Sequence, residues 1–140
     1  MITYVDTSTL LKRLLADDGS DEADVIWDAA DVLVSAATVV VEARAALAAA
    51  QRGGRLTAAE LSDAKAELAD LFEELAFVEI TAELIADAAV IAEAEALRGY
   101  DAVHLAAALA IDANVLTSAD TALCDAAERR GLHVANPLDA

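Results

Sequence analysis

Five short apolar runs, separated by longer segments with helical spacing, constrain the fold of this chain more than any other feature. The runs lie at 2–5, 32–35, 77–80, 115–117 and 132–134. The first of them is followed by leucines at 10, 11, 14 and 15, which recur with the period of a helix. Strands that alternate with helices predict an α/β fold with a mainly parallel sheet.

The length and composition predict one domain that spans residues 1–140. Of the 140 residues 58% are hydrophobic, which is enough for a substantial core. No apolar run reaches the ~18 residues of a membrane span, and the N-terminus lacks the pattern of a signal peptide, so a cytoplasmic location is predicted. Cys124 is the single cysteine and has apolar neighbours, which favours a packed thiol over a nucleophile.

The segment at about 37–76 is predicted to form a helical hairpin. Its first arm, 37–51, is rich in alanine, although the β-branched residues at 38–41 leave a longer strand open as an alternative. A Gly-Gly pair ends this arm, and Thr57 and Glu60 have the spacing of a capping box that starts the second arm.

Three other helix boundaries follow from single residues. Ser20 is predicted to cap a short helix that runs to about Ala30, and Thr81 to cap the helix after the third apolar run. Gly99 is predicted to break that helix, and a strongly apolar helix is then expected over 100–113.

The charge of the chain limits the kind of partner it can bind. The formal net charge is −17, with nine Lys and Arg against 26 Asp and Glu. This balance argues against the broad basic surface of a non-specific nucleic-acid binder, so any contact with nucleic acid must be local. A basic protein is the natural complement to such an acidic surface.

Four of the acids interrupt apolar or tightly patterned stretches. Asp6 follows the first strand, Glu42 lies in the valine-rich segment after the second, Asp101 opens an apolar helix, and Asp120 follows the fourth strand. The carboxyl ends of parallel strands share one edge of a sheet, where ligand and metal sites gather. All four acids are therefore predicted to lie at or near that edge.

Each acid also has a purely structural interpretation. Asp6 and Asp120 suit helix N-caps worth ~1 kcal/mol, and Asp101 suits the first turn of a helix. Glu42 is harder to explain. Burying a carboxylate among valine and alanine costs several kcal/mol of folding free energy unless the carboxylate is paired, protonated or bound to a cation. Arg44 is a poor mate for it, since a residue two positions along lies on another helix face.

Taken together, the four acids favour a metal site. Carboxylates that converge on one cleft repel each other, and a divalent cation removes that repulsion. Oxygen ligands suit Mg²⁺ or Mn²⁺, and no Cys or His pair has the spacing of a structural zinc site. Such clusters hold metals that activate water for phosphodiester hydrolysis, so the sequence predicts a metal-assisted nuclease.

The motifs around these acids resemble those of PIN-domain ribonucleases. They lie at 4–8, at Glu42 in a helix after the second strand, at 97–106 and at 116–120. Their order and the chain length are similar to those of VapC toxins of type II toxin–antitoxin systems, over essentially the whole chain. The stretch around Asp101 is the most specific part of this resemblance.

The resemblance implies a three-layer sandwich whose five-stranded sheet has the order 3-2-1-4-5. It also implies a Mg²⁺-dependent endoribonuclease, with Mn²⁺ as a possible substitute, that forms a homodimer and is inhibited by a cognate antitoxin. Asp6 and Asp101 would be the principal metal ligands, and Glu42 and Asp120 would complete the catalytic site. A metal-bound water would then attack the RNA phosphodiester. The phosphate backbone would meet a few cations from Lys12, Arg13, Arg44, Arg52 and Arg55.

Other residues near these motifs have less certain roles. Thr7 or Ser8 is expected to orient Asp6, and Ser118 either to contact the site or to cap the last long helix. Arg98 is expected to steady the acids, to meet an RNA phosphate or only to complement a helix dipole. His104 is interpreted as a packed, hydrogen-bonded histidine rather than a catalytic one.

Two other classes of function are alternatives to the nuclease. An acid-edge phosphotransfer domain fails on detail, because Ser8 stands where a phosphatase needs a second Asp, and a receiver domain needs a late lysine although none follows Lys65. A non-catalytic acidic module that binds a basic partner is the remaining alternative.

Overall fold

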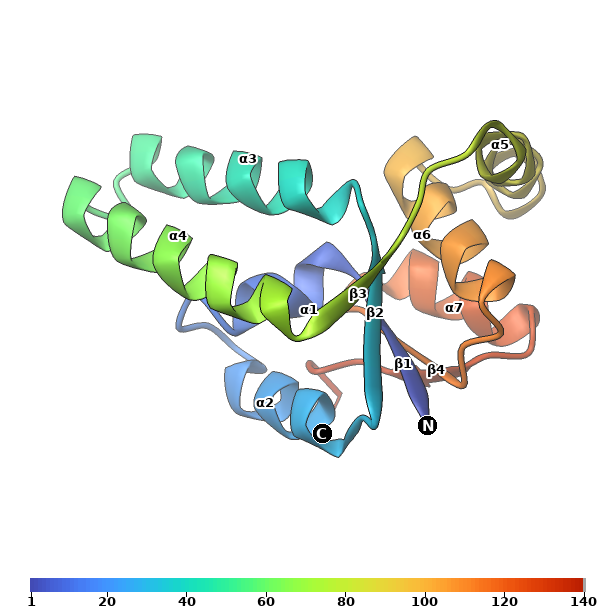
Figure 1. Cartoon of the computed structure of the whole chain (residues 1–140), viewed down its shortest axis with the longest axis horizontal. Helices are drawn as coiled ribbons and strands as arrows, with labels where there is room; N and C mark the ends of the chain where they lie inside the picture. The colour runs from blue at the N-terminus through green and yellow to red at the C-terminus, as the bar shows by residue number, and fades with distance from the viewer. Residues whose placement is uncertain (140) are drawn as a thin grey trace.

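The computed structural model describes residues 1–139, which form one sheet of five parallel strands. The strands are β1 (Ile2–Val5), β2 (Val32–Ala36), β3 (Leu75–Val78), β4 (Val115–Thr117) and β5 (His133–Ala135). Their order is β3-β2-β1-β4-β5, with β1 at the centre (Figure 1). The predicted α/β class and the predicted strand order are both confirmed.

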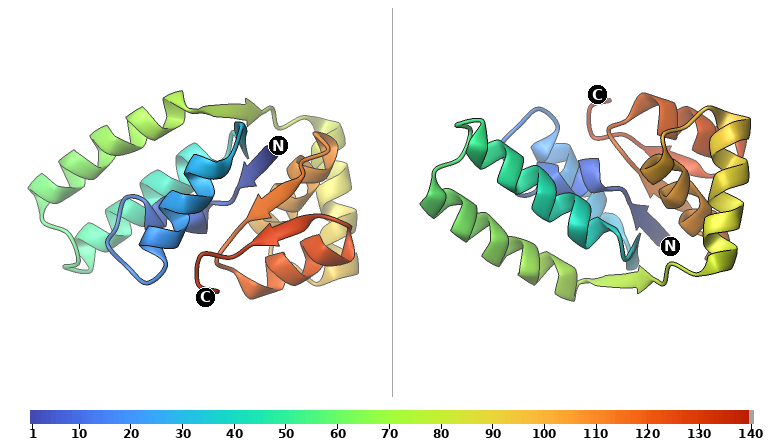
Figure 2. Two further views of the ribbon diagram at one scale, coloured as in Figure 1. Left: turned by 90° about the horizontal axis from the view of Figure 1, so that it is seen from below. Right: turned by 90° about the horizontal axis from the view of Figure 1, so that it is seen from above.

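Helices cover both faces of this sheet (Figures 1 and 2). One face carries α1 (Thr7–Lys12), α2 (Ser20–Ala29), α3 (Val39–Arg52) and α4 (Ala58–Glu73), and the other carries α5 (Ala82–Glu95), α6 (Gly99–Ala110) and α7 (Thr121–Arg129). Side chains alternate along a strand, so Tyr4 packs in the α5–α7 core and its neighbour Val5 in the α1–α4 core. The three layers therefore enclose two separate cores.

The third strand lies two residues earlier than the predicted 77–80. β3 pairs with β2 from Leu75, opposite Leu33, to Val78, opposite Ala36. Because β2 ends at Ala36, residues 79 and 80 have no partner on it. Leu75 is also buried in the α1–α4 core, which fixes the start of the strand directly after α4.

The β-branched residues at 38–41 do not extend the second strand. α3 begins at Val39, because Val39, Ala43 and Leu47 recur every four residues and are fully buried against the sheet. Burial of this apolar face outweighs the modest helix propensity of valine. The last strand is likewise shifted, to His133–Ala135 in place of 132–134.

Two helix boundaries differ from the predicted ones. Gly99 does not break α5; it is the first residue of α6, and α5 ends at Glu95 with Ala96 in the left-handed region at φ 53°. Burial of Leu97 in the α5–α7 core, next to Ala96, accompanies this unusual conformation. Ser20 does not cap α2 either, because Gly19 at φ 84° takes that position and the Ser20 hydroxyl donates to the carbonyl of Leu15.

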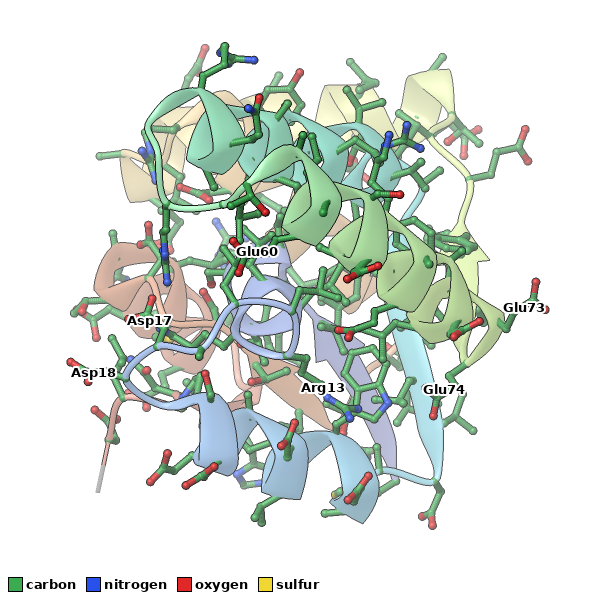
Figure 3. All side chains as sticks on the ribbon, turned by 90° about the vertical axis from the view of Figure 1, so that its left-hand side faces the viewer. Arg13, Asp17, Asp18, Glu60, Glu73 and Glu74 are labelled. Carbon is green, nitrogen blue, oxygen red and sulfur yellow. The ribbon has the colours of Figure 1, made fainter. Side chains whose placement is uncertain are left out.

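Helices α3 and α4 form a hairpin that extends away from α5, α6 and α7 (Figure 2). The predicted capping box starts α4: Glu60 N–H donates to Thr57 Oγ1 at 3.1 Å, and Thr57 N–H donates to Glu60 Oε1 at 2.9 Å. Trp27 of α2 contacts two residues labelled in Figure 3: its ring lies 5.0 Å from the guanidinium of Arg13, at the end of α1, and its indole N–H donates to Glu74, at the end of α4. Within residues 1–139 no helix is long and apolar enough to cross a membrane.

Candidate active site

The predicted acids gather where three adjacent strands end. Asp6 follows β1, Asp120 lies between β4 and α7, and Glu42 lies in the first turn of α3 after β2. The chain leaves β1 toward β2 on one side, and β4 lies on the other side, so this is the point where the strand order reverses. Crevices at such switch points are the usual binding sites of open parallel sheets.

Asp6 is buried, and its carboxylate is held by two serine hydroxyls. Ser8 Oγ donates to Asp6 Oδ2 at 2.7 Å, and Ser118 Oγ donates to the same oxygen at 2.8 Å. The residue occupies the N-cap position of α1, but its side chain makes no capping hydrogen bond. The alternative interpretation of Asp6 as a helix cap therefore fails, and of the two hydroxyls expected to orient it, Ser8 does so and Thr7 does not.

Glu42 is paired with the fully buried His104. His104 Nε2 lies 2.9 Å from Glu42 Oε1, and Thr7 Oγ1 donates to Glu42 Oε2 at 2.9 Å. The same imidazole nitrogen lies 3.5 Å from Asp6 Oδ1. His104 is therefore packed and hydrogen-bonded, as the sequence indicated, and it stands between two of the predicted site acids.

The hydroxyl of Tyr4 fixes the imidazole from the other side. Ala36 N–H donates to Tyr4 Oη at 2.9 Å, and Tyr4 Oη lies 2.6 Å from His104 Nδ1. When the ring is neutral, the Tyr4 hydroxyl donates its proton to Nδ1, and when the ring is protonated, Nδ1–H donates to Tyr4 Oη. In both states Nε2 carries a proton and donates to Glu42. Sequence reasoning missed this role, because Tyr4 reads as one more apolar strand residue.

Arg98 bridges the other two acids. Its Nε donates to Asp101 Oδ2 at 3.2 Å and its Nη2 donates to Asp120 Oδ2 at 3.0 Å. The other oxygen of Asp120 accepts from Leu123 N–H at 3.0 Å, so Asp120 is also the N-cap of α7. One oxygen of Asp120 thus serves as the helix cap, and the other is held by Arg98.

The pKa directions of these groups follow from their surroundings. Burial raises the pKa of the Asp101 carboxyl, and the charges of Asp6 and Asp120 raise it further against the effect of Arg98. Burial also opposes ionisation of Glu42, but the hydrogen bond and charge of His104, with a hydrogen bond from Thr7, hold its pKa below the ordinary value. Burial lowers the pKa of His104, but the hydrogen bond to Glu42 and the nearby acids outweigh it and raise that pKa.

A cleft of about 640 Å³ opens over this cluster. It is lined by Glu42, Arg98, Gly99, Tyr100, Asp101 and Val103. The volume falls within the range of about 300–1,000 Å³ that is common for ligand sites. Asp6 and Asp120 do not line the cleft. The two predicted acids in its wall are Glu42, from α3, and Asp101, from α6 on the other side of the sheet.

The chemistry of the donor set suits a hard divalent cation. Carboxylates supply the available oxygens, and repulsion from Asp6 and Asp120 adds to burial in raising the pKa of Asp101. Within residues 1–139, however, no group of three His, Cys, Asp or Glu side chains has the arrangement of a formed metal site. The oxygens are instead engaged by Arg98, by His104 and by serine hydroxyls, so a cation would have to displace some of these partners.

Cys124 takes no part in this arrangement. Its thiol is buried and donates to the carbonyl of Ser118 at 3.3 Å, and burial together with nearby acids, led by Asp6 and Asp120, raises its pKa to about 12. A thiol held in its neutral form is a poor nucleophile. Cys124 is therefore the packed residue that the sequence predicted.

Comparison with known proteins identifies the family. The model of the PIN domain matches residues 3–129. Ribonuclease VapC45 of Mycobacterium tuberculosis is 41% identical over 110 residues, which cover 79% of this chain and 76% of the relative. The structure of FitAcB from Neisseria gonorrhoeae has the same fold, with a TM-score of 0.76 at 19% identity and full coverage of both chains.

A second solved structure agrees with the first. VapBC2 from Rickettsia felis, bound to a DNA fragment from its promoter, has a TM-score of 0.66 at 13% identity and covers 97% of this chain and 98% of its own. At such identities the two structures establish the fold alone. The family model and the 41% identical relative go further, and this chain belongs to the PIN domain family, among its VapC ribonucleases.

Proposed function

We propose that this chain is a Mg²⁺-dependent endoribonuclease and the toxin of a toxin–antitoxin pair. The observation that carries the proposal is the meeting of Asp6, Glu42, Asp101 and Asp120 around one strand edge in a chain that belongs to the VapC ribonucleases. Nucleases of the PIN domain family generally use a divalent metal.

Mg²⁺ is the ion we assign to the site, with Mn²⁺ as a substitute, and the four acids are its proposed ligands. When bound, the ion supplies a Lewis acid for the phosphate and lowers the pKa of a water molecule. Ser8 and Ser118 hold Asp6 in place, and His104 does the same for Glu42. The low pKa of Glu42 keeps its carboxylate ionised at neutral pH, as a ligand must be.

Cleavage of RNA by the purified chain tests this function. We expect the chain to hydrolyse a single-stranded RNA in millimolar Mg²⁺, to lose this activity in a chelator, and to regain it when Mn²⁺ is added. Cleavage that persists in the chelator would contradict a metal-dependent mechanism. The absence of cleavage under all three conditions would favour a non-catalytic module.

Arg98→Ala is expected to tighten binding of the divalent ion. The guanidinium now neutralises Asp101 and Asp120, and these two carboxylates in turn raise its pKa. Because exposed ion pairs are weak, we expect an affinity about fivefold higher for Mn²⁺ by isothermal titration calorimetry. Arg129→Ala, which removes an arginine paired with Glu95, is the matched control. Equal or weaker ion binding by Arg98→Ala would show that the arginine does not compete with metal.

The few cations without a carboxylate partner indicate where an RNA backbone can run. Six of the nine Lys and Arg are ion-paired within residues 1–139, and the three others are Arg44, Arg52 and Lys65. All three lie on α3 or α4, and Arg44 and Lys65 line a groove between these helices with exposed Val40 and Val41. This hairpin joins the site at Glu42, in the first turn of α3.

The double variant Arg44→Ala, Lys65→Ala is expected to weaken RNA binding in a salt-dependent way. Two lost phosphate contacts reduce the slope of log affinity against log salt by about 1.4 for a single strand. Fluorescence anisotropy at several salt concentrations measures the slope, with Arg129→Ala as control. An unchanged slope would exclude this groove as a phosphate path.

An antitoxin partner is proposed from the family and from the charge of the chain. The solved structures of the same fold include VapBC2 from Rickettsia felis, and a net charge of −17 favours a partner with a basic segment. Since the proposed substrate is RNA, both proteins are assigned to the cytoplasm. Purification from the native source that recovers no small basic protein would count against the partner.

A homodimer is the proposed assembly. Its support is the resemblance to VapC toxins, together with exposed apolar side chains such as Ile85 and Val90 on α5. Light scattering across micromolar concentrations tests it, and a mass of one chain at every concentration would exclude the dimer.

A further inference from the structure

Tyr100 is the one aromatic side chain within residues 1–139 that is both exposed and without an aromatic or cationic neighbour. The sequence has five Phe, Trp and Tyr. Tyr4 is buried against His104, Trp27 is covered by Arg13, and Phe72 packs edge to face on Phe77. Tyr100 is 59% exposed, and no residue in the described part of the chain bonds its hydroxyl. Its ring therefore has no structural task in the folded chain.

The position of Tyr100 points to a ligand rather than to chance. It lies in the first turn of α6, next to Asp101, and lines the cleft of about 640 Å³ together with Arg98, Gly99 and Glu42. A methyl group on Gly99 would meet no atom within 4 Å, so the space beside the tyrosine is open. Val103, one turn along the same helix, adds an apolar wall to the cleft.

We infer that Tyr100 is a stacking platform for a nucleobase of the RNA, next to the phosphate that is cleaved. The inference rests on the proposed ribonuclease function. Single-stranded RNA is recognised by aromatic rings that stack on unpaired bases, and every base has a face suited to such stacking. The exposed guanidinium of Arg98 lines the same cleft and suits an adjoining phosphate. The cleft thus has an apolar side for the base and a charged side for the backbone.

Stacking predicts a preference among bases. Purines offer a larger ring face than pyrimidines, so base preference at this subsite follows stacking strength rather than hydrogen bonding. Tyr100→Ala is expected to weaken binding of an adenine octamer by about tenfold or more, and of a uracil octamer by less. Tyr100→Phe retains the ring and is expected to bind within about twofold of the parent.

The test uses 5′-fluorescein-labelled A₈ and U₈ RNA and the full chain carrying Asp6→Asn, which prevents cleavage during the measurement. Anisotropy in Mg²⁺ gives the affinity of the parent, of Tyr100→Ala and of Tyr100→Phe. Val25→Ala, which trims an exposed apolar side chain on α2, is the matched control. In the otherwise native chain, Tyr100→Ala is expected to raise KM with little change in kcat, because stacking acts on substrate and transition state alike.

The outcomes separate this inference from the proposed function. If the native chain cleaves RNA and Tyr100→Ala changes neither affinity nor KM, the stacking platform is wrong and the ribonuclease stands. Failure of Asp6→Asn to bind either octamer would also overturn the platform. Loss of antitoxin binding in Tyr100→Ala with unaltered RNA binding would assign the ring to a protein interface instead. Cleavage that is insensitive to chelator would refute the proposed function itself.

Discussion

Asp6→Asn is expected to lower Mg²⁺-dependent cleavage of RNA by about 10³-fold, the rate equivalent of about 4 kcal/mol of lost transition-state stabilisation. Asparagine has nearly the same shape as aspartate, and its amide oxygen still accepts from Ser8 and Ser118. What disappears is the negative charge of a carboxylate that is buried at the centre of the sheet edge. A single-turnover assay at saturating Mg²⁺ measures the effect on the chemical step.

The fold should survive this substitution. Asp6 raises the pKa of Asp101 by repulsion, so its neutralisation relieves a like-charge contact. We therefore expect a melting temperature equal to or above that of the native chain. Asp63→Asn, at an exposed position on α4, is the matched control and should leave both cleavage and melting unchanged. Cleavage by Asp6→Asn within threefold of native would remove Asp6 from the catalytic site.

Tyr4→Phe is expected to destabilise the chain by about 2–4 kcal/mol and to weaken metal binding. The lost hydroxyl leaves Ala36 N–H and His104 Nδ1 without partners in a buried position, and each unsatisfied group costs about 1–3 kcal/mol. The imidazole is then free to carry its proton on Nδ1, which removes the donor to Glu42. Loss of such outer hydrogen bonds typically lowers metal affinity by about 10–100-fold.

Two measurements separate these effects. Urea unfolding gives the free energy of unfolding, and calorimetric titration with Mn²⁺ at a temperature where the variant is folded gives the affinity. Tyr100→Phe removes a hydroxyl that is exposed and unbonded, so it should change stability by less than about 0.5 kcal/mol. A variant Tyr4→Phe as stable as Tyr100→Phe would show that the buried hydroxyl does not bridge Ala36 and His104.

The sequence carried enough information for the fold and for the location of the acids. Apolar runs that alternate with segments of helical spacing predict the parallel sheet. Acids that follow β1, β2 and β4 must then lie at the same edge of that sheet, whatever the exact register of the strands. Register itself was harder to predict. β3 begins at Leu75 because β2 ends at Ala36 and α4 delivers Leu75 to the core, and neither constraint is local to 77–80.

The partners of the acids could not be predicted, because they come from distant parts of the chain. His104 was recognised as packed from its apolar surroundings, but its contact with Glu42 joins residues 62 positions apart. The Tyr4 hydroxyl meets His104 across 100 positions. The signal available in the sequence was the hydroxyl group of Tyr4 in an otherwise apolar strand, since a buried tyrosine hydroxyl usually has a hydrogen-bond partner.

The two cores give the site a further property, which concerns its timing during synthesis. Glu42 belongs to the layer built from the first half of the chain, whereas Asp101, His104 and Asp120 arrive with the last third. The cleft cannot form until α6 has left the exit tunnel of the ribosome, because residues 98–101 and 103 make up one of its walls. The site of this nuclease is therefore incomplete until translation of its own chain is nearly finished.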